Sequence, residues 1–126
     1  MTVSELPLLV IEDEPSVQVF LRTALERDGF DIVLASSGVE GLRLLQQRDF
    51  RAVISDMRTP GGVNGGDVHS WLSANRPELV AKMLFITGDI VNDETTEILQ
   101  RTGVRCIEKP FRVQELLAAV KQVIGT

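Results

Sequence analysis

Residues 8–15 read Leu8-Leu9-Val10-Ile11-Glu12-Asp13-Glu14-Pro15, and this stretch indicates how the chain folds. Four consecutive apolar residues, with no polar residue between them, are typical of a parallel strand that is covered on both faces. Proline is a common first residue of a helix. The stretch therefore predicts a buried strand, a short acidic loop and then a helix.

The pattern of a strand followed by a helix recurs four more times. Further apolar runs occupy 32–35, 52–54, 83–86 and 104–107. We expect helices at 15–27, after Ser37, around Trp71, at 93–101 and after Pro110. This alternation predicts an α/β fold with a five-stranded parallel sheet, doubly wound by five helices in the flavodoxin-like manner. The strand order 2-1-3-4-5 is a common order for such a sheet.

Length and composition limit the classes of function. The chain has 126 residues, 44% of them hydrophobic, which is enough for a single domain, 1–126, with its own core. A net charge of −5 argues against binding to nucleic acid or to an anionic membrane surface. Cys106 and His69 are too few ligands for a zinc site.

The N-terminal residues do not have the pattern of a signal peptide, which is a basic segment followed by a long apolar one. The longest apolar stretch, 6–11, is far too short to span a membrane. We therefore expect a soluble, cytoplasmic protein.

Four of the expected strands end in polar or charged residues. These ends are Glu12-Asp13-Glu14, Ser55-Asp56, Thr87-Gly88-Asp89 and Glu108-Lys109-Pro110. In doubly wound sheets, ligands bind beyond the carboxyl ends of the strands, where the strand order reverses. We expect Glu12, Asp13 and Asp56 to converge there. Thr87 and Lys109 should close one side.

Three carboxylates at one place need a compensating charge. Each like-charged pair at 4 Å costs about 4 kcal/mol at an effective dielectric near 20. Mg²⁺ removes this repulsion and is commonly held by one or two carboxylates. With Lys109 and the Thr87 hydroxyl beside it, Asp56 is suited to accept a phosphoryl group as an aspartyl phosphate. A single acid at a strand end is more often a solvated polar residue. The phosphoacceptor hypothesis therefore depends on all four strand ends together. Glu14 alone is interpreted as an acid that favours a helix start.

On these residues the chain resembles the receiver domain of two-component response regulators, from residue 8 to about residue 124. The motifs that carry the resemblance are Glu12-Asp13, Asp56 followed by Pro60, Thr87-Gly88 and Lys109-Pro110-Phe111. The resemblance implies that Asp56 takes a phosphoryl group from a histidine of a histidine kinase or a histidine phosphotransfer protein. It also implies a switch that is not a turnover enzyme on an external substrate and that could form a homodimer on phosphorylation.

The resemblance further implies roles for the neighbours of Asp56. The ligands of Mg²⁺, with Mn²⁺ as a substitute, would be Asp13, Asp56, the Met57 carbonyl and, through water, Glu12. The groups that bind the phosphoryl oxygens and report their arrival would be Thr87, Gly88 and Lys109.

Two further sets of residues are expected at the rim of the site. A histidine donor must reach Asp56, so by resemblance and by position we expect its domain to contact Glu14, Val17, Pro110 and Phe111. Water must approach the phosphorus from the side opposite Asp56. Arg58 and Asp89 are expected to flank that approach, where their opposite charges could pair. A guanidinium there would obstruct the water, so we expect a long-lived phosphoryl group.

The loop after Asp56 departs from the family pattern. Asn64 stands eight residues after Asp56, where glycine is usual, and Gly65 follows it. We therefore expect the loop 57–66 to be one residue longer than usual.

Two single positions also depart from the pattern. Cys106 stands three residues before Lys109, where an aromatic switch residue is common, so we expect the signal to be carried by Thr87 and residues 88–92. Glu12 stands where Asp is commoner.

Other interpretations compete with a phosphorylated receiver. A degenerate receiver would act only as a protein-docking module, but the complete set of site residues argues against it. A flavodoxin-like mononucleotide site needs a phosphate-binding loop after the first strand, and Glu12-Asp13-Glu14 would repel phosphate there. An aspartyl-phosphate hydrolase would carry its nucleophile after the first strand and need a cap domain. With no output domain after the last helix, we expect either a stand-alone regulator or the receiver of a larger protein such as a hybrid histidine kinase.

Overall fold

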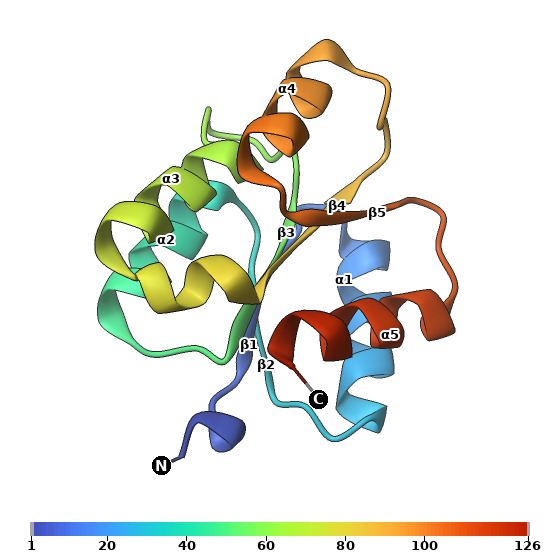
Figure 1. The fold of residues 1–126 in the computed structure, drawn as a ribbon. Helices are drawn as coiled ribbons and strands as arrows, with labels where there is room; N and C mark the ends of the chain where they lie inside the picture. The colour runs from blue at the N-terminus through green and yellow to red at the C-terminus, as the bar shows by residue number, and fades with distance from the viewer. Residues whose placement is uncertain (1, 126) are drawn as a thin grey trace.

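The computed structural model describes residues 2–125 and contains one parallel sheet (Figure 1). Its strands are β1 (Leu8–Ile11), β2 (Ile32–Ala35), β3 (Ala52–Asp56), β4 (Met83–Thr87) and β5 (Arg105–Glu108). Their order is β2-β1-β3-β4-β5, and every neighbouring pair is parallel. The predicted sheet and its order are therefore confirmed.

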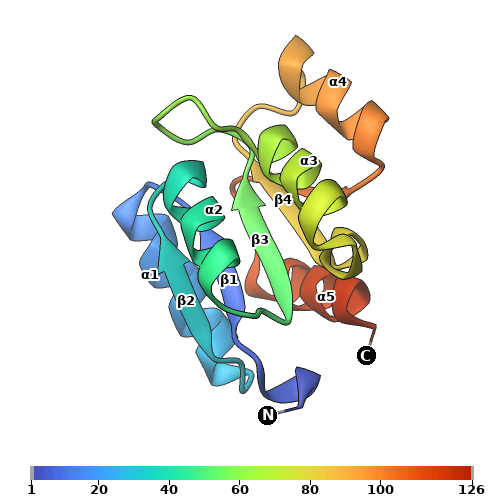
Figure 2. The same ribbon diagram turned by 90° about the vertical axis from the view of Figure 1, so that its left-hand side faces the viewer.

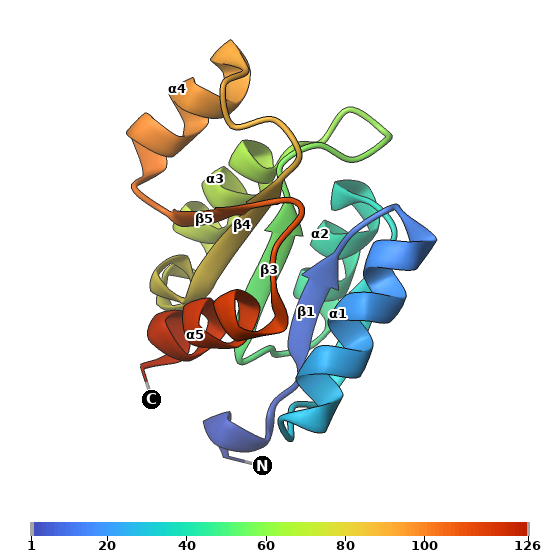
Figure 3. The same ribbon diagram turned by 90° about the vertical axis from the view of Figure 1, so that its right-hand side faces the viewer.

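Five α-helices cover the two faces of the sheet. They are α1 (Pro15–Arg27), α2 (Gly38–Gln47), α3 (Gly65–Asn75), α4 (Asp93–Thr102) and α5 (Val113–Ile124). Figures 2 and 3 show α1 and α5 on one face and α2 and α3 on the other, with α4 beyond α3. Two short 3-10 helices that the sequence did not predict, η1 (Val3–Glu5) and η2 (Pro77–Lys82), precede β1 and β4. Within residues 2–125, none of the helices combines the length and the apolar character that a membrane span requires.

The sheet is buried between two apolar layers. Successive residues of β1 point to opposite faces, so Leu8 and Val10 pack with α1 and α5, whereas Leu9 and Ile11 pack with α2 and α3. The three inner strands β1, β3 and β4 are buried along their whole length, which explains why their sequences are nearly continuous apolar runs. β5 lies at an edge of the sheet, which agrees with the exposed Arg105 that interrupts its apolar run.

The two helices of the α1–α5 face are less completely covered than their apolar periodicity suggests. Leu21 and Leu25 of α1 and Leu116 of α5 are fully buried. Phe20 and Val113, which belong to the same apolar stripes, are 37% and 39% exposed. They line a cavity between the two helices, so the helices do not close completely over the sheet.

Candidate functional site

The carboxyl ends of four strands meet at one edge of the sheet. The parallel register places Asp56 at the end of β3 opposite Ile86 of β4. Just beyond the ladder, the Met57 N–H donates to the Ile86 carbonyl and the Lys109 N–H donates to the Thr87 carbonyl, both at 2.8 Å. These bonds fix the chain that follows β3 and β5 to the end of β4.

The Lys109 ammonium connects the acids of this edge. Its Nζ lies 2.9 Å from Glu12 Oε1, 3.0 Å from Glu14 Oε1 and 3.1 Å from Asp56 Oδ2. Glu12 is fully buried and Asp56 is 7% exposed, so water screens these charges little. The structure therefore brings together the residues at the ends of β1, β3 and β5 that the sequence placed at one site.

Burial dominates the acid–base properties of the site. It raises the pKa of both Glu12 and Asp56, and the positive charge of Lys109 offsets only part of this effect. For Lys109, burial alone would lower the pKa, but its contacts with Glu12, Glu14 and Asp56 raise that pKa above its usual value. Lys109 is therefore a fixed positive charge beside Asp56 at neutral pH.

A set of three carboxylates could hold a metal ion. Glu12, Asp13 and Asp56 each place an oxygen within 4.8 Å of the others. Glu12 Oε2 accepts the Glu14 N–H at 3.0 Å. Glu12 Oε1 is buried and, among residues 2–125, accepts no well-directed hydrogen bond, although the Lys109 Nζ is close to it. An all-oxygen donor set of clustered carboxylates fits a hard cation such as Mg²⁺ or Mn²⁺.

Asp13, Glu14 and Asp56 border a cavity of about 350 Å³. The predicted phosphoryl-binding and lifetime residues all line it, namely Thr87, Gly88, Lys109, Arg58 and Asp89. The Thr87 side chain is almost completely buried, and its Oγ1 accepts the Asp89 N–H at 3.1 Å. Thr95 of α4 also lines the cavity and is buried. The sequence did not predict Thr95, because no pattern along the chain tells how α4 lies over the site.

The predicted pairing of Arg58 with Asp89 is wrong. The Arg58 guanidinium instead lies 4.0 Å from Glu94 Oε2, and no ion pair within residues 2–125 involves Asp89. Asn92 explains the difference, because its Oδ1 accepts the N–H groups of Glu94 and Thr95 and so fixes the start of α4. The first turn of α4 then places Glu94, and not Asp89, within reach of Arg58.

Met57, a predicted metal ligand, has another role in the structure. It is fully buried, and its carbonyl accepts the Gly65 N–H at 2.9 Å. Met57 does not line the cavity, whereas the next residue, Arg58, does. These contacts argue against the Met57 carbonyl as a ligand, and Arg58 is the residue next to it that lines the cavity.

The loop between β3 and α3 turns at two glycines. Gly61 and Gly62 have φ values of 97° and 81°, a conformation that favours glycine. Asn64 caps α3, since its Oδ1 accepts the Asp67 N–H at 2.8 Å. A Cβ on Gly65 would lie 2.9 Å from the Phe85 ring. In this loop the close approach to Phe85 therefore requires glycine at Gly65, directly after Asn64.

Glu14 does more than favour a helix start. It is the N-cap residue of α1, but its side chain makes no capping hydrogen bond and contacts Lys109 instead. The sequence could not indicate this contact, because Glu14 and Lys109 are 95 residues apart.

The four predicted docking residues share one cavity of about 570 Å³ beside Lys109. They are Glu14, Val17, Pro110 and Phe111. Phe20, which the sequence did not predict, also lines this cavity, and its ring meets the Phe111 ring edge-on with centroids 5.6 Å apart.

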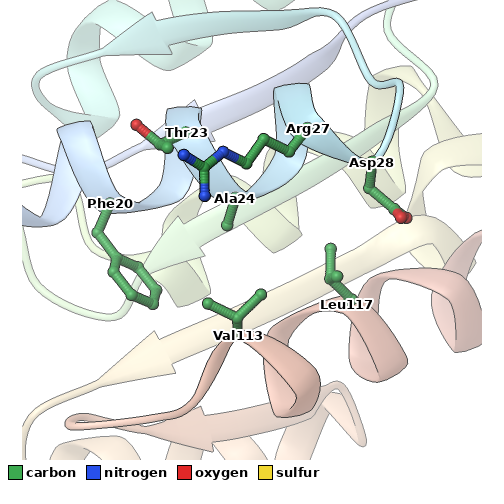
Figure 4. A pocket seen from close by; sticks show the side chains of 7 residues that line it. All are labelled: Phe20, Thr23, Ala24, Arg27, Asp28, Val113 and Leu117. Carbon is green, nitrogen blue, oxygen red and sulfur yellow. The ribbon is translucent and has the colours of Figure 1, made fainter.

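Phe20 also lines a second cavity, of about 400 Å³, which Figure 4 shows between α1 and α5. There Phe20 and Ala24 of α1 face Val113 and Leu117 of α5. We call the two cavities together the α1–α5 groove. One of them lies beside Lys109 and the other lies between the two helices, and Phe20 lines both.

Cys106 lies half-buried on β5, where its backbone is opposite Phe85 of β4. Burial raises the pKa of its thiol to about 11, and the negative charges of Glu108 and Asp56 add to the effect. A thiol with this environment behaves as a small apolar side chain and not as a reactive nucleophile.

Comparisons with known proteins bear on this site. A family model described as response regulator receiver domain matches residues 8–121. The transcriptional regulatory protein CusR of Escherichia coli K12 is 30% identical over 117 residues, which are 93% of this chain and 50% of CusR. The chain thus spans half the length of that relative.

Solved structures give the same match. A response regulator receiver domain protein from Clostridium thermocellum superimposes with a TM-score of 0.80 and 28% identity, over 95% of this chain and 94% of that one. The receiver domain of a sensor histidine kinase from Pseudomonas aeruginosa, solved with a magnesium ion in its active-site cleft, superimposes with a TM-score of 0.84 and 21% identity, over 96% of this chain and 98% of that one.

Proposed function

This chain belongs to the response regulator receiver domain family of two-component signalling, and from that premise we propose that Asp56 is its phosphoacceptor. One observation carries the proposal. The Asp56 carboxylate lies at the wall of a polar cavity, beside a fixed ammonium at 3.1 Å and two further acids. Such a carboxylate is accessible to a phosphoryl donor, and the ammonium beside it can offset the negative charge of the aspartyl phosphate that forms.

In the proposed transfer, an oxygen of Asp56 attacks the phosphorus of a phosphohistidine on a partner protein. A P–O bond forms, the P–N bond breaks, and the imidazole leaves with the electron pair and takes up a proton. Lys109 offsets the negative charge of the phosphoryl oxygens without moving far, because it already contacts Asp56. The Thr87 hydroxyl, on the wall of the same cavity, donates a hydrogen bond to one of these oxygens.

We propose Mg²⁺ as the cofactor, with Mn²⁺ as a substitute. Asp13 and Asp56 would hold it together with the Arg58 carbonyl, and Glu12 would act through water. When bound, the ion supplies the positive charge that three clustered acids and a phosphoryl group require. The all-carboxylate donor set and the magnesium ion of the Pseudomonas receiver support this assignment.

The α1–α5 groove is the proposed contact surface for the histidine donor. Receiver domains pair with histidine kinases or phosphotransfer proteins, and the groove starts directly beside the acceptor site. Its apolar walls include Val17, Phe20 and Phe111. Exposed aromatic and aliphatic side chains next to a charged site are typical of protein-binding surfaces.

The proposed switch consists of Thr87 and residues 88–92. When the Thr87 hydroxyl turns toward the phosphoryl group, its bond from the Asp89 N–H is weakened, and the segment that leads into α4 can rearrange. Cys106 has neither the ring nor the hydroxyl of the usual aromatic switch residue, so it is not expected to take part.

We propose that residues 1–126 form one receiver domain. It takes part in its own phosphorylation and does not turn over an external substrate. A purified chain mixed with phosphorylated histidine kinases of its source organism and Mg²⁺ should gain acid-labile label from at least one of them. A docking-only module would bind a kinase and gain no label. A hydrolase would release phosphate continuously without retaining label.

A further inference from the structure

Glu94, in the first turn of α4, is bound to the loop that follows Asp56. Its Oε1 accepts a hydrogen bond from Asn64 Nδ2 at 2.9 Å, and its Oε2 lies 4.0 Å from the Arg58 guanidinium. Asn64 and Arg58 lie at the two ends of this loop. One carboxylate therefore links the start of α4 to the segment that carries the acceptor.

Asn64 is a rigid anchor for this link. Its Oδ1 accepts the Asp67 N–H at 2.8 Å, and the Asp67 carboxylate accepts the Asn64 N–H at 2.9 Å. This capping box fixes which atom of the Asn64 amide faces α3, so the Nδ2 group is left to point at Glu94. The loop has a second anchor on its other flank, where Thr59 Oγ1 accepts the Gly38 N–H at 2.8 Å.

The segment 88–92, by contrast, is held by few contacts. Apart from the bonds that Asn92 accepts from the N–H groups of Glu94, Thr95 and Thr96, two hydrogen bonds involve this segment within the described residues. The Asp89 N–H donates to Thr87 at 3.1 Å, and the Thr96 hydroxyl donates to the Ile90 carbonyl at 3.4 Å. Ile90 and Val91 are 38% and 83% exposed. A segment with few buried contacts opens easily, so a single well-directed link at its end has a large share in holding it.

We propose that Glu94 is a positioning residue that ties the first turn of α4 to the acceptor loop and so sets how readily residues 88–95 leave their resting arrangement. The inference rests on the proposed function, because the event that moves this segment is the engagement of Thr87 by the phosphoryl group. The tie stabilises the resting arrangement only. Removing it therefore lowers the cost of reaching the phosphorylated arrangement.

The test compares Glu94→Ala with Asp93→Ala. Both variants remove one acid from the first turn of α4, but no hydrogen bond or ion pair within residues 2–125 involves the Asp93 side chain. With acetyl phosphate and Mg²⁺, we expect Glu94→Ala to take up label about two- to fivefold faster than Asp93→Ala, the size of effect of an exposed charged contact. Equal or slower uptake would contradict the proposal that Glu94 restrains residues 88–95.

A second variant tests the partner of Glu94. Asn64→Asp keeps an oxygen that can cap α3 but loses the N–H donor to Glu94, so it should also speed uptake. The double variant should be no faster than the faster single variant, because both changes break the same link. Additive acceleration would show that the two residues act independently and would contradict the inference.

Amide hydrogen exchange separates this inference from the proposed function. In unphosphorylated protein, amides in the first two turns of α4 should exchange about two- to fivefold faster in Glu94→Ala than in Asp93→Ala. If no variant and no wild-type chain is labelled, the proposed function fails, and the exchange rates alone decide whether the tie exists. If all are labelled at one rate, the function stands and the tie has no regulatory role.

Discussion

The Lys109 ammonium lies 3.1 Å from Asp56 Oδ2, although the two residues are 53 positions apart in the chain. The Lys109 N–H donates to the Thr87 carbonyl, so the backbone next to the ammonium is fixed to the end of β4. The same ammonium also contacts Glu12 and Glu14. One ammonium thus lies beside three carboxylates, so it balances only part of their negative charge and leaves the rest for a metal ion to offset.

Asp13 should be needed for metal binding. Asp13→Ala removes one of the three clustered carboxylates, so we expect the affinity for Mg²⁺ to fall about tenfold or more, as measured by isothermal titration calorimetry. Glu14→Ala is the matched control, because Glu14 lines the same cavity but is outside the cluster. Equal losses in the two variants would contradict the assignment of Asp13 as a direct ligand.

Phe20 should matter for a protein donor only. Phe20→Ala and Phe111→Ala each remove an aromatic wall of the α1–α5 groove, so transfer from a phosphorylated histidine protein should slow about five- to thirtyfold, the effect of losing 1–2 kcal/mol at an interface. Labelling by acetyl phosphate should be unchanged. Val19→Ala, on the same helix and 65% exposed but outside the groove, should behave as wild type with both donors. Slowing with both donors would argue against docking.

Arg58 should protect the phosphorylated state. Its side chain lines the site cavity and is 56% exposed, so it can obstruct the water that attacks the phosphorus. We expect Arg58→Ala to speed the first-order loss of label about two- to fivefold, a change of roughly 0.4–1 kcal/mol in the barrier. Asp89→Ala should have a smaller or opposite effect. An unchanged rate in Arg58→Ala would show that the guanidinium does not guard the site.

The Cys106 thiol should react slowly with disulfide reagents, because its raised pKa keeps it protonated. With a pKa of about 11 in place of 9.0, it carries about 100-fold less thiolate at pH 8. Its reaction with a disulfide reagent should therefore be at least that much slower in native protein than in urea, and should keep rising above pH 9. Glu108→Gln removes a charge that raises this pKa and should speed the reaction. Equal native and unfolded rates would contradict the burial of the thiol.

The sheet could be predicted because its inner strands are covered on both faces. The runs at β1, β3 and β4 contain few polar residues, and 2-1-3-4-5 is a common order for a doubly wound sheet of such strands. The ladder includes Asp56 and Thr87, so β3 and β4 end in the polar residues that the sequence predicted for them.

The centre of the site could be predicted for the same reason, since parallel strands deliver their carboxyl ends to one edge. The contacts between loops could not be predicted from the sequence. Whether Arg58 meets Asp89 or Glu94 depends on how α4 begins, and the contact of Glu14 with Lys109 depends on the path of the loop after β5. The role of Met57 depends on the hydrogen bond that its carbonyl makes with Gly65, which no spacing reveals.

The most direct test of the account is the stoichiometry of phosphoryl labelling in Asp56→Asn. Asparagine has nearly the shape of aspartate but cannot form an acyl phosphate, so the fold should be kept while the acceptor is lost. With acetyl phosphate and Mg²⁺, wild-type protein should gain about one acid-labile phosphoryl group per chain, and peptide mapping should place it on Asp56. Asp56→Asn, with an unchanged circular dichroism spectrum, should gain none. Stoichiometric labelling of Asp56→Asn, or a wild-type label on another residue, would contradict the central claim.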